Sequence, residues 1–469
     1  MVLGGMKRPN RRISVDRASK EKLIIAAAAI VLLYLLISLY FNNHYFFHTE
    51  INGVDVSLKA HDKAEHIIKD YLKDYRIELI ERDGETEVIT GAEVGMQYNE
   101  RNGISNIHRK QNNLKWITSL ARSHNYYVAD LYYFNNDSLN RKVNQLNCMN
   151  KKVVEPSNVN FKYYRGTYEV IKEVYGNKVI EDQLKKTVQK YMLQGKTQLD
   201  LNKTLCYENP KYTLSSAKTL QTKSLLHKYV SAKITYLFGS KNEIIDGAVI
   251  NRWLSVDSDL EVVINSTAAM NYIKQLSNTY DTVGVSRDFN TSVGKKIVVS
   301  GGLYGWKIDR EGEAEALINH IKRGEIIQKE PIYIQRALYR DTNDIGNTYV
   351  EINITRQHLW FYRDGKLITH GSVVTGNPNR GNATVRGTYM LIYKQIGATL
   401  TGPGYEAPVT YWMPFFGDMG IHDASWRHSF GGEIYKSRGS HGCVNAPIYL
   451  AKKIFENIDE GIPIIIYEE

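Results

Sequence analysis

An apolar run near the N-terminus constrains this chain more than any other feature. Leu23–Phe41 contains 19 residues and no charged side chain, close to the ~20 residues that a helix needs to cross a hydrocarbon core of roughly 30 Å. Seven basic and two acidic residues precede the run, a net charge of +5. Because basic flanks stay on the cytoplasmic side, we expect residues 1–22 to be a cytoplasmic tail and residues 23–41 a single transmembrane helix. The rest of the chain would then lie on the outer, cell-wall side of the cell membrane.

A cleaved signal peptide is the alternative for this run. The apolar core of a signal peptide usually spans about 7–15 residues and ends at a small-x-small cleavage site. The run here is longer, and the following Phe41–His44 contains no small residue. We therefore expect a retained membrane anchor.

Charge and cysteine content exclude two classes of protein. The chain carries a net charge of +10, and half of it lies in the tail, so the exported part lacks the clustered basic face that nucleic-acid binding needs. Its three cysteines are too few for a disulfide framework. Cys148 and Cys206 either pair with each other or remain two buried thiols, and Cys443 is free in both cases.

Two α+β segments follow the apolar run. In residues 51–221, apolar side chains recur at helical spacing over Asp62–Tyr75, and a hairpin pattern follows. Residues 222–338 repeat this mixture, with helices expected around Thr267–Asn278 and Gly312–Lys322.

The last segment, residues 347–469, reads differently. Short alternating stretches separated by Gly and Asn turns predict a mainly β fold, a sandwich or small barrel. One helix is expected near Leu450–Ile458, and Gly461–Tyr467 closes the chain as a buried strand.

A histidine and a cysteine near the C-terminus form the candidate catalytic pair. Ile421-His422-Asp423 precedes Ser440-His441-Gly442-Cys443-Val444-Asn445. A nucleophilic thiol needs a base, a group that orients the base, and backbone N–H donors for the developing oxyanion. His422 is the candidate base, and Gly442 allows a tight turn that exposes backbone amides. The pattern favours a cysteine acyl-transfer enzyme.

The chain resembles the L,D-transpeptidases with a YkuD-type catalytic domain. His422 and the Ser440–Asn445 motif carry the resemblance over residues 347–468, with support from Val374-Thr375-Gly376 and Trp412-Met413-Pro414-Phe415. Residues 222–335 resemble the peptidoglycan-binding domain that precedes this catalytic domain in Gram-positive enzymes, and residues 51–221 resemble a diverged copy. One departure is Thr384-Val385-Arg386-Gly387, where many members have Thr-Pro-x-Gly.

The resemblance implies the reaction and the role of each residue. The Cys443 thiolate would attack the third residue of a donor tetrapeptide stem, expel D-alanine and form a thioester, and an acceptor amine would then complete a 3→3 peptidoglycan cross-link. His422 would be the base, with the Ser440 carbonyl orienting its ring. Gly442 and Cys443 would supply the oxyanion amides and His441 would position substrate. Acylation by carbapenem-type β-lactams is expected, and no cofactor or metal is.

Five further side chains are candidates for binding the stem peptide. Aromatic rings near the motif would wall a peptide groove, although large aromatics are as often core residues. Arg427, Lys436 and Arg438 are cations near the motif that could meet a stem-peptide carboxylate, although surface charges are often only solvated. Of these, Arg438 is the expected binding residue. The expected substrate-binding residues are Tyr405, Trp412, Trp426, Arg438 and Asn445.

Other functions compete with cross-linking. His422, Asp423, His441 and Cys443 are all zinc-ligand types, but His441 and Cys443 are only two positions apart and no His-Glu-x-x-His helix is present. Water in place of the acceptor amine would make the protein an L,D-carboxypeptidase. A non-catalytic wall-binding scaffold would have no need to keep the whole motif.

Overall fold

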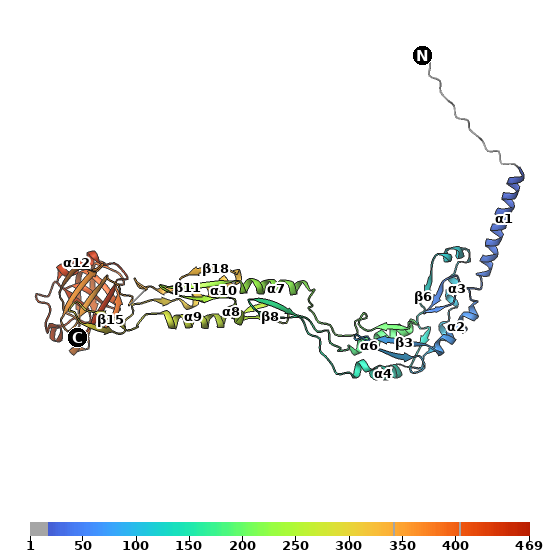
Figure 1. The fold of residues 1–469 in the computed structure, drawn as a ribbon, viewed down its shortest axis with the longest axis horizontal. Helices are drawn as coiled ribbons and strands as arrows, with labels where there is room; N and C mark the ends of the chain where they lie inside the picture. Colours follow the sequence, from blue (N-terminus) through green and yellow to red (C-terminus); the bar gives the residue numbers. More distant parts are fainter. Residues whose placement is uncertain (1–16, 341–342, 403–404) are drawn as a thin grey trace, which may run out of the picture. The chain divides into compact units, whose positions relative to one another are not determined.

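The computed structural model describes residues 17–340, 343–402 and 405–469, with the side chains of Asn102 and Tyr405 outside the description. The chain divides into two compact units (Figure 1). The first ends at Thr213 but omits residues 160–171, and the second combines residues 160–171 with residues 214–469. A boundary between residues 221 and 222, as expected from sequence, would cut through helix α7 (Ala217–Val230). The two units divide between residues 213 and 214.

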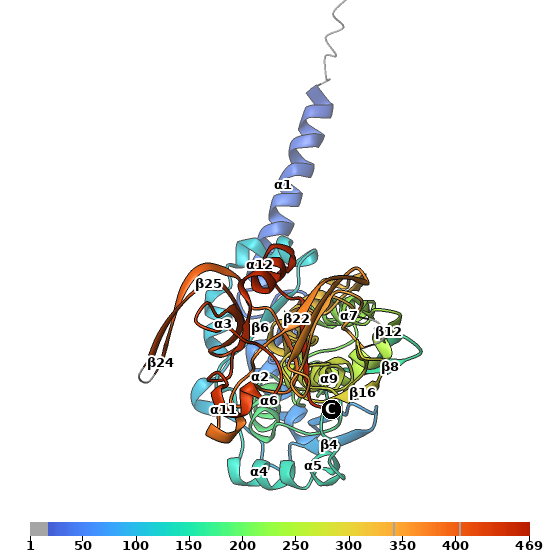
Figure 2. The same cartoon turned by 90° about the vertical axis from the view of Figure 1, so that its left-hand side faces the viewer.

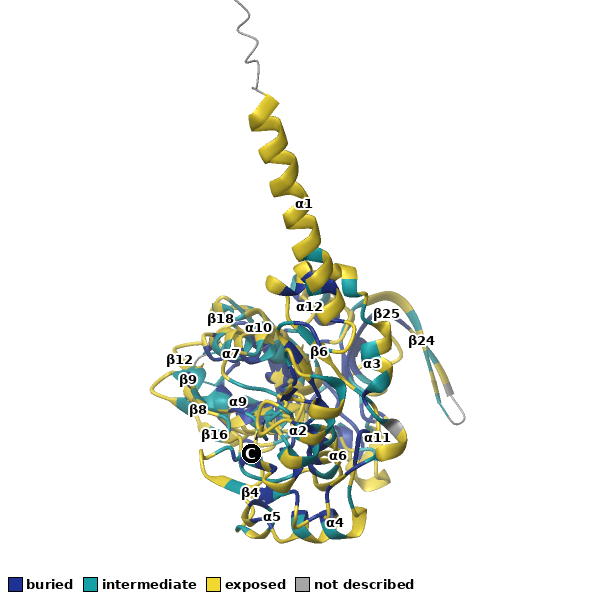
Figure 3. Ribbon diagram, turned by 90° about the vertical axis from the view of Figure 1, so that its right-hand side faces the viewer, coloured by how far each residue is buried: buried dark blue, intermediate teal, exposed yellow. Residues whose placement is uncertain are grey.

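The first unit begins with the predicted apolar helix. Helix α1 (Arg17–Tyr40) is long and apolar enough to cross a membrane, and it is exposed along nearly its whole length (Figure 3). By length and composition a signal sequence would pass the same test. The predicted helix is therefore confirmed, while its place in a membrane remains a prediction.

Three small sheets and several helices build the rest of the first unit. The sheets have the strand orders β2-β1-β6, β10-β3-β4 and β5-β7. Their strands are β1 (Thr49–Ile51), β2 (Val54–Asp55), β3 (Arg76–Ile80), β4 (Thr86–Thr90), β5 (Gln97–Tyr98), β6 (His124–Tyr126), β7 (Tyr132–Tyr133) and β10 (Gln198–Asp200). The helices after α1 are α2 (His61–Lys73), η1 (Glu100–Asn102), α3 (Ser105–Lys110), η2 (Asn113–Leu120), α4 (Asn136–Asn144), α5 (Asn147–Asn150) and α6 (Glu181–Leu193).

The helix and hairpin expected in the first unit are confirmed. Helix α2 covers most of the expected Asp62–Tyr75, because its apolar residues recur every three or four positions and pack into the core. Strands β3 and β4 form the expected hairpin. Cys148 and Cys206 are two free, buried thiols, as in one of the two alternatives from the sequence.

The second unit begins with an α+β domain. Strands β11 (Lys233–Phe238), β12 (Lys241–Ile245) and β18 (Ile326–Lys329) form its sheet, in the order β12-β11-β18. Helices α9 (Ser266–Tyr280) and α10 (Arg310–Arg323) confirm the two predicted helices. The other elements are β8 (Asn160–Tyr164), β9 (Thr167–Ile171), α7, α8 (Gly247–Ile250), η3 (Asn251–Trp253), β13 (Leu254–Val256), β14 (Val262–Ile264), β15 (Arg287–Asn290), β16 (Lys296–Val299), β17 (Lys307–Ile308) and β19 (Tyr333–Gln335).

The C-terminal domain is mainly β, as predicted, and consists of two sheets around one core. Five strands pair in the order β22-β21-β20-β28-β23: β20 (Tyr349–Asn353), β21 (His358–Arg363), β22 (Lys366–Ser372), β23 (Gly387–Met390) and β28 (Pro463–Tyr467). Four pair in the order β24-β25-β26-β27: β24 (Gln395–Gly402), β25 (Tyr405–Phe416), β26 (Met419–Asp423) and β27 (Val444–Ala446). Two helices are present rather than the one expected, since α11 (Ile434–Arg438) accompanies α12 (Ile448–Asn457), and η4 (Pro378–Arg380) adds a 3₁₀ turn.

The hairpin of β15 and β16 attaches the α+β domain to the C-terminal domain. Phe289 and Val299 share a small buried cluster with Ile465 and Tyr467 of β28. The buried Glu351 carboxylate accepts the Ser292 N–H at 2.9 Å and the Tyr467 hydroxyl at 2.7 Å. These contacts join the two domains within one unit.

Candidate active site

Strand pairing brings the candidate base and nucleophile together. Strands β26 and β27 are parallel neighbours, with His422 opposite Asn445. The loop from Ser440 to Cys443 enters β27, so Cys443 is near the strand position that carries His422. His422 and Cys443 are 21 positions apart in sequence, and the parallel pairing of β26 with β27 brings them to the same region.

His422 and Cys443 both line a pocket of about 540 Å³. The lining comes from the ends of β26 and β27, the Ser425–Arg427 segment after β26, the motif loop, and the hairpin of β24 and β25. Figure 2 shows this hairpin reaching out from the C-terminal domain. The lining residues are Leu400, Glu406, Ala407, Pro408, His422, Ser425, Trp426, Arg427, Gly439, Ser440, His441, Cys443 and Asn445.

Burial keeps the resting thiol protonated. The Cys443 thiol is largely desolvated, and this raises its pKa to about 11, although the Gly420 N–H opposes the shift. Its hydrogen bond goes to the Asp418 carbonyl, with Sγ and O 3.4 Å apart. The side chain is still partly accessible from the pocket.

Burial keeps the imidazole neutral as well. His422 is 2 % exposed, and desolvation lowers its pKa below the ordinary value of 6.5. Its Nδ1 is 2.8 Å from the Asp423 carbonyl, an arrangement that places the proton on Nδ1 and leaves Nε2 as the basic nitrogen. Such a ring can accept a proton from a thiol.

The group that orients the His422 ring differs from the expected one. The Ser440 carbonyl is the expected orienting group, but it accepts the Asn377 N–H at 3.0 Å. The Asp423 carbonyl binds the ring instead, because it follows His422 directly at the end of β26. The carbonyl that orients the ring therefore belongs to the residue next to His422 in the chain.

The Ser440 hydroxyl closes the motif loop on itself. It donates to the Cys443 carbonyl and accepts the Gly442 N–H at 3.1 Å. Of the two expected oxyanion donors, the Gly442 amide is therefore already bonded, which makes the Cys443 amide the stronger candidate. A serine hydroxyl serves here as a loop brace.

Thr384, which lies outside the motif, also holds the motif loop; this role was not expected from the sequence. Its buried hydroxyl donates to the Gly442 carbonyl at 2.8 Å and accepts the Gly376 N–H at 2.8 Å. Gly442 itself has φ +124, and a Cβ there would approach Met419 Cε to 2.8 Å. The loop conformation thus depends on glycine at position 442.

The Asp423 carboxylate fixes β25 against β26. Its Oδ1 accepts the backbone N–H groups of Thr410 and Tyr411 at 2.8 and 2.7 Å, and the side chain is 2 % exposed. This buried anion is satisfied by two backbone donors. It holds the strand end on which His422 lies.

The expected substrate-binding residues fall into three groups. Trp426 and Asn445 line the pocket, and the buried Asn445 Oδ1 has no hydrogen-bond partner among the described residues. Trp412 is a core residue with its ring 5.9 Å from that of His422, and Arg438 is exposed at the end of α11; neither lines the pocket. The Tyr405 side chain lies outside the described residues.

Arg427 is one of three cations near the motif that the sequence offers to a stem-peptide carboxylate, although Arg438 is the expected binding residue. Arg427 lines the pocket, and its buried Nε has no partner among the described residues. Desolvation and the charge of Arg438 lower its pKa, and its guanidinium faces the pocket. Its nearness to the motif is the signal in the sequence, and a solvated surface arginine gives the same signal.

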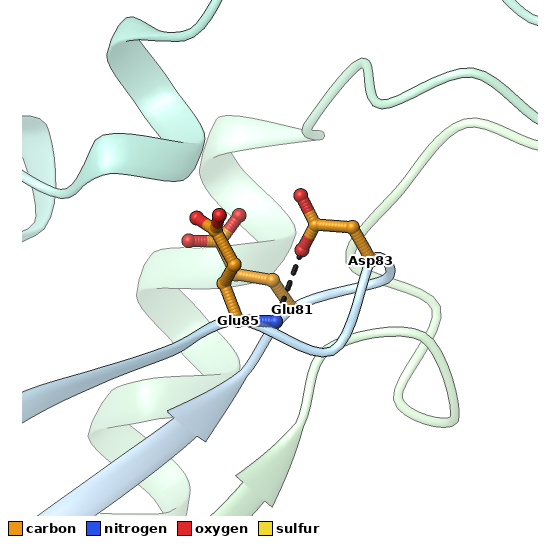
Figure 4. Close-up of side chains that lie close together, drawn as sticks. All are labelled: Glu81, Asp83 and Glu85. Carbon is orange, nitrogen blue, oxygen red and sulfur yellow. Dashed lines mark hydrogen bonds between the residues drawn. The ribbon is translucent and has the colours of Figure 1, made fainter.

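The residues proposed as zinc ligands are used otherwise. The Asp423 carboxylate binds backbone amides and His422 Nδ1 binds a carbonyl. Within the described ranges, the one group of three close ligand-type side chains is Glu81, Asp83 and Glu85 (Figure 4). Lys151 Nζ lies 2.8, 2.9 and 2.8 Å from these carboxylates, so an ammonium group already occupies the space between them.

Comparison with protein families agrees with this geometry. Residues 347–466 match the family described as L,D-transpeptidase catalytic domain. Residues 214–326 match the family described as "Putative peptidoglycan binding domain". No curated protein matches the chain.

Solved structures with similar sequences are L,D-transpeptidases. A mutant of the Enterococcus faecium L,D-transpeptidase is 31% identical, with 53% of this chain and 100% of that chain covered and a TM-score of 0.44. The Ldtfm-avibactam carbamoyl enzyme is 30% identical, with 54% and 99% covered and a TM-score of 0.45. The catalytic domain of the E. faecium enzyme acylated by ertapenem is 38% identical, with 26% and 98% covered and a TM-score of 0.25.

Proposed function

Because the chain belongs to the L,D-transpeptidases with a YkuD-type catalytic domain, we propose that it forms 3→3 peptidoglycan cross-links from a membrane anchor, with Cys443 as nucleophile. The observation that carries this proposal is the pocket lined by both the Cys443 thiol and the His422 imidazole. Peptidoglycan is the substrate class of the family, and the domain matched at residues 214–326 fits the same substrate.

The first half-reaction makes a thioester. As Cys443 Sγ attacks the carbonyl of the third stem residue, His422 Nε2 takes the thiol proton, and an oxyanion forms. The Cys443 N–H stabilises this charge; one such donor contributes about 3 kcal/mol. Collapse breaks the bond to D-alanine, and the imidazolium returns the proton to its departing amine.

The second half-reaction makes the cross-link. The side-chain amine of a third residue in an acceptor stem attacks the thioester, His422 accepts its proton, and the thiol is released as the new amide forms. Water as the attacking group would release a tripeptide instead. The hairpin residues Leu400, Ala407 and Pro408 line the pocket and favour the peptide over water by covering it with apolar surface.

Arg427 supplies recognition of the donor in this proposal. The departing D-alanine carries a free carboxylate one residue from the attacked carbonyl, and a guanidinium binds a carboxylate with charge-assisted hydrogen bonds. Arg427 lines the pocket with a buried, unpaired Nε. Trp426, 45% exposed, offers a flat wall for the peptide beside it.

Inhibition and location follow from the same proposal. Two of the similar structures are an avibactam carbamoyl enzyme and a catalytic domain acylated by ertapenem, and we extend acylation by such compounds to Cys443 here. Helix α1 would hold the protein in the cell membrane with the catalytic domain on the cell-wall side.

Intact-mass spectrometry of the full-length protein with a disaccharide-tetrapeptide tests the proposal. We expect a cross-linked dimer, or an adduct that has lost D-alanine, in the wild type and in Cys148→Ala, but not in Cys443→Ala. Tripeptide alone would indicate a carboxypeptidase. Absence of any adduct or product from folded protein would instead favour the non-catalytic scaffold.

A further inference from the structure

A short 3₁₀ segment packs against the C-terminal end of α1. In η2 (Asn113–Leu120), the Trp116 ring lies 5.5 Å from that of Tyr34 and 6.1 Å from that of Phe41. The Tyr34 hydroxyl donates to the Leu114 carbonyl. Gln111, just before the segment, donates to the carbonyls of Phe41 and His44 at 3.2 and 2.8 Å. The segment is thereby fixed beside residues 34–41 of the apolar run.

The length of α1 determines the depth at which this contact lies. At a rise of 1.5 Å per residue, Tyr34 is roughly 10 Å below Phe41 along the helix axis. If residues 34–41 stood outside the bilayer, Leu23–Leu33 would span only about 17 Å, far short of the ~30 Å core. Residues 34–41 therefore lie within the outer leaflet of any membrane that α1 crosses, and the segment that packs on them lies there too.

The faces of η2 differ in chemistry. A 3₁₀ helix has three residues per turn, so residues three apart line one face. Trp116 and Ser119 form the buried face. Leu114, Ile117 and Leu120 form a second face and are 57%, 54% and 52% exposed. Single exposed leucines are ordinary on a protein surface, but three in one column beside an apolar helix form a continuous apolar surface.

Basic residues lie within η2 and close to it in the chain. Arg109, Lys110, Lys115 and Arg122 are all exposed. Amphipathic segments that lie in a membrane interface combine an apolar face with basic residues that meet anionic headgroups. The third face of η2 carries Lys115 and Thr118, consistent with a polar side directed to headgroups and water.

We propose that η2 is a second membrane contact of this protein, with the Leu114, Ile117 and Leu120 face in the acyl-chain boundary of the outer leaflet. The partner is an anionic lipid bilayer. This inference rests on the proposed membrane anchoring by α1. It adds that the first unit is fixed at the membrane surface by two contacts, rather than attached through one flexible point.

Fluorescent labelling of the full-length protein tests the contact. An environment-sensitive fluorophore is attached to Ile117→Cys in a Cys443→Ser background, and the protein is reconstituted into vesicles of phosphatidylcholine and phosphatidylglycerol with brominated acyl chains. Val153→Cys is the matched control, because Val153 has the same 54% exposure in the same unit. Ile30→Cys, within α1, reports insertion of the anchor itself.

We expect quenching at position 117 roughly twofold or more above that at position 153, together with quenching at position 30. Quenching at position 30 without quenching at position 117 would overturn the η2 contact and leave the anchor intact. Quenching at neither position would overturn both. If Ile117→Cys fails to fold, Leu120→Cys reports the same face.

Discussion

At the scale of single residues, burial shifts the pKa values of the proposed catalytic pair, His422 and Cys443, towards the neutral forms. Desolvation raises the pKa of the Cys443 thiol to about 11 and lowers that of the His422 imidazole. Both changes favour the neutral form, so the resting pair is a thiol and an imidazole rather than an ion pair. Charge separation then arises only during attack, when the oxyanion donors are in use.

The pH dependence of acylation follows from this neutral pair. His422 must be unprotonated to accept the thiol proton, and its lowered pKa keeps it unprotonated to a pH below 6.5. We expect the rate of acylation by ertapenem, measured by intact mass, to stay level down to pH 6.5 and to fall only at lower pH. A tenfold rise per pH unit from pH 7 towards the thiol pKa of about 11 would instead indicate attack by pre-formed thiolate without the histidine.

Arg427 provides a second prediction at this scale. Loss of a hydrogen bond to a charged group costs about 1.5–3 kcal/mol, so Arg427→Gln should lower kcat/KM for the tetrapeptide roughly 10- to 150-fold. A donor that ends in D-alanine carboxamide is the test substrate. The wild type should discriminate against it and Arg427→Gln should not. Equal discrimination by both proteins would remove Arg427 from donor recognition; Arg438→Gln is the control outside the pocket.

At the scale of secondary structure, one carboxylate holds the strand that carries the base. Asp423 Oδ1 binds two backbone N–H groups of β25. Asp423→Ala would leave both of these partly buried N–H groups without their acceptor, at about 1–2.5 kcal/mol for each. We expect urea unfolding to show a loss of about 2–5 kcal/mol.

Asp418→Ala is the matched control for that substitution. Asp418 is exposed in the turn before β26, and it contacts the thiol only through its backbone carbonyl. Its removal should change the free energy of unfolding by less than about 0.5 kcal/mol. Equal losses for the two variants would contradict the role assigned to Asp423.

Most elements could be predicted from periodicity, but the hairpin of β24 and β25 beside the pocket was not predicted. Helix α9 and the hairpin of β3 and β4 follow directly from apolar spacing and turn residues. The long hairpin of β24 and β25 was not among the expected elements: Ile396, Ala398 and Leu400 alternate along β24, but every residue of that strand is exposed or half-buried. Helix α11 was not predicted either, because its five residues are too few to show the repeat of a helix.

At the scale of the whole molecule, the second unit couples an α+β domain to the catalytic domain. Phe289 of β15 is buried against Ile465 and Tyr467 of β28. Phe289→Ala should cost about 3–5 kcal/mol. Because the contact is shared, hydrogen exchange should quicken both in β11 and in β20. Val298→Ala, on the same hairpin but 64% exposed, should leave both unchanged, and faster exchange in only one domain would show that the domains unfold independently.

The sequence by itself determined the apolar helix and the mainly β fold of residues 347–469, and it singled out His422 and Cys443, which line one pocket. Each depends on residue type at a short or characteristic spacing. The tertiary structure alone decided that the Asp423 carbonyl orients the imidazole, that Thr384 braces the motif loop, and that Arg427 rather than Arg438 lines the pocket. Those three facts depend on the direction in which a carbonyl, a hydroxyl or a guanidinium points. That direction is set by strand register and packing between residues far apart in the chain, which residue identity does not encode locally.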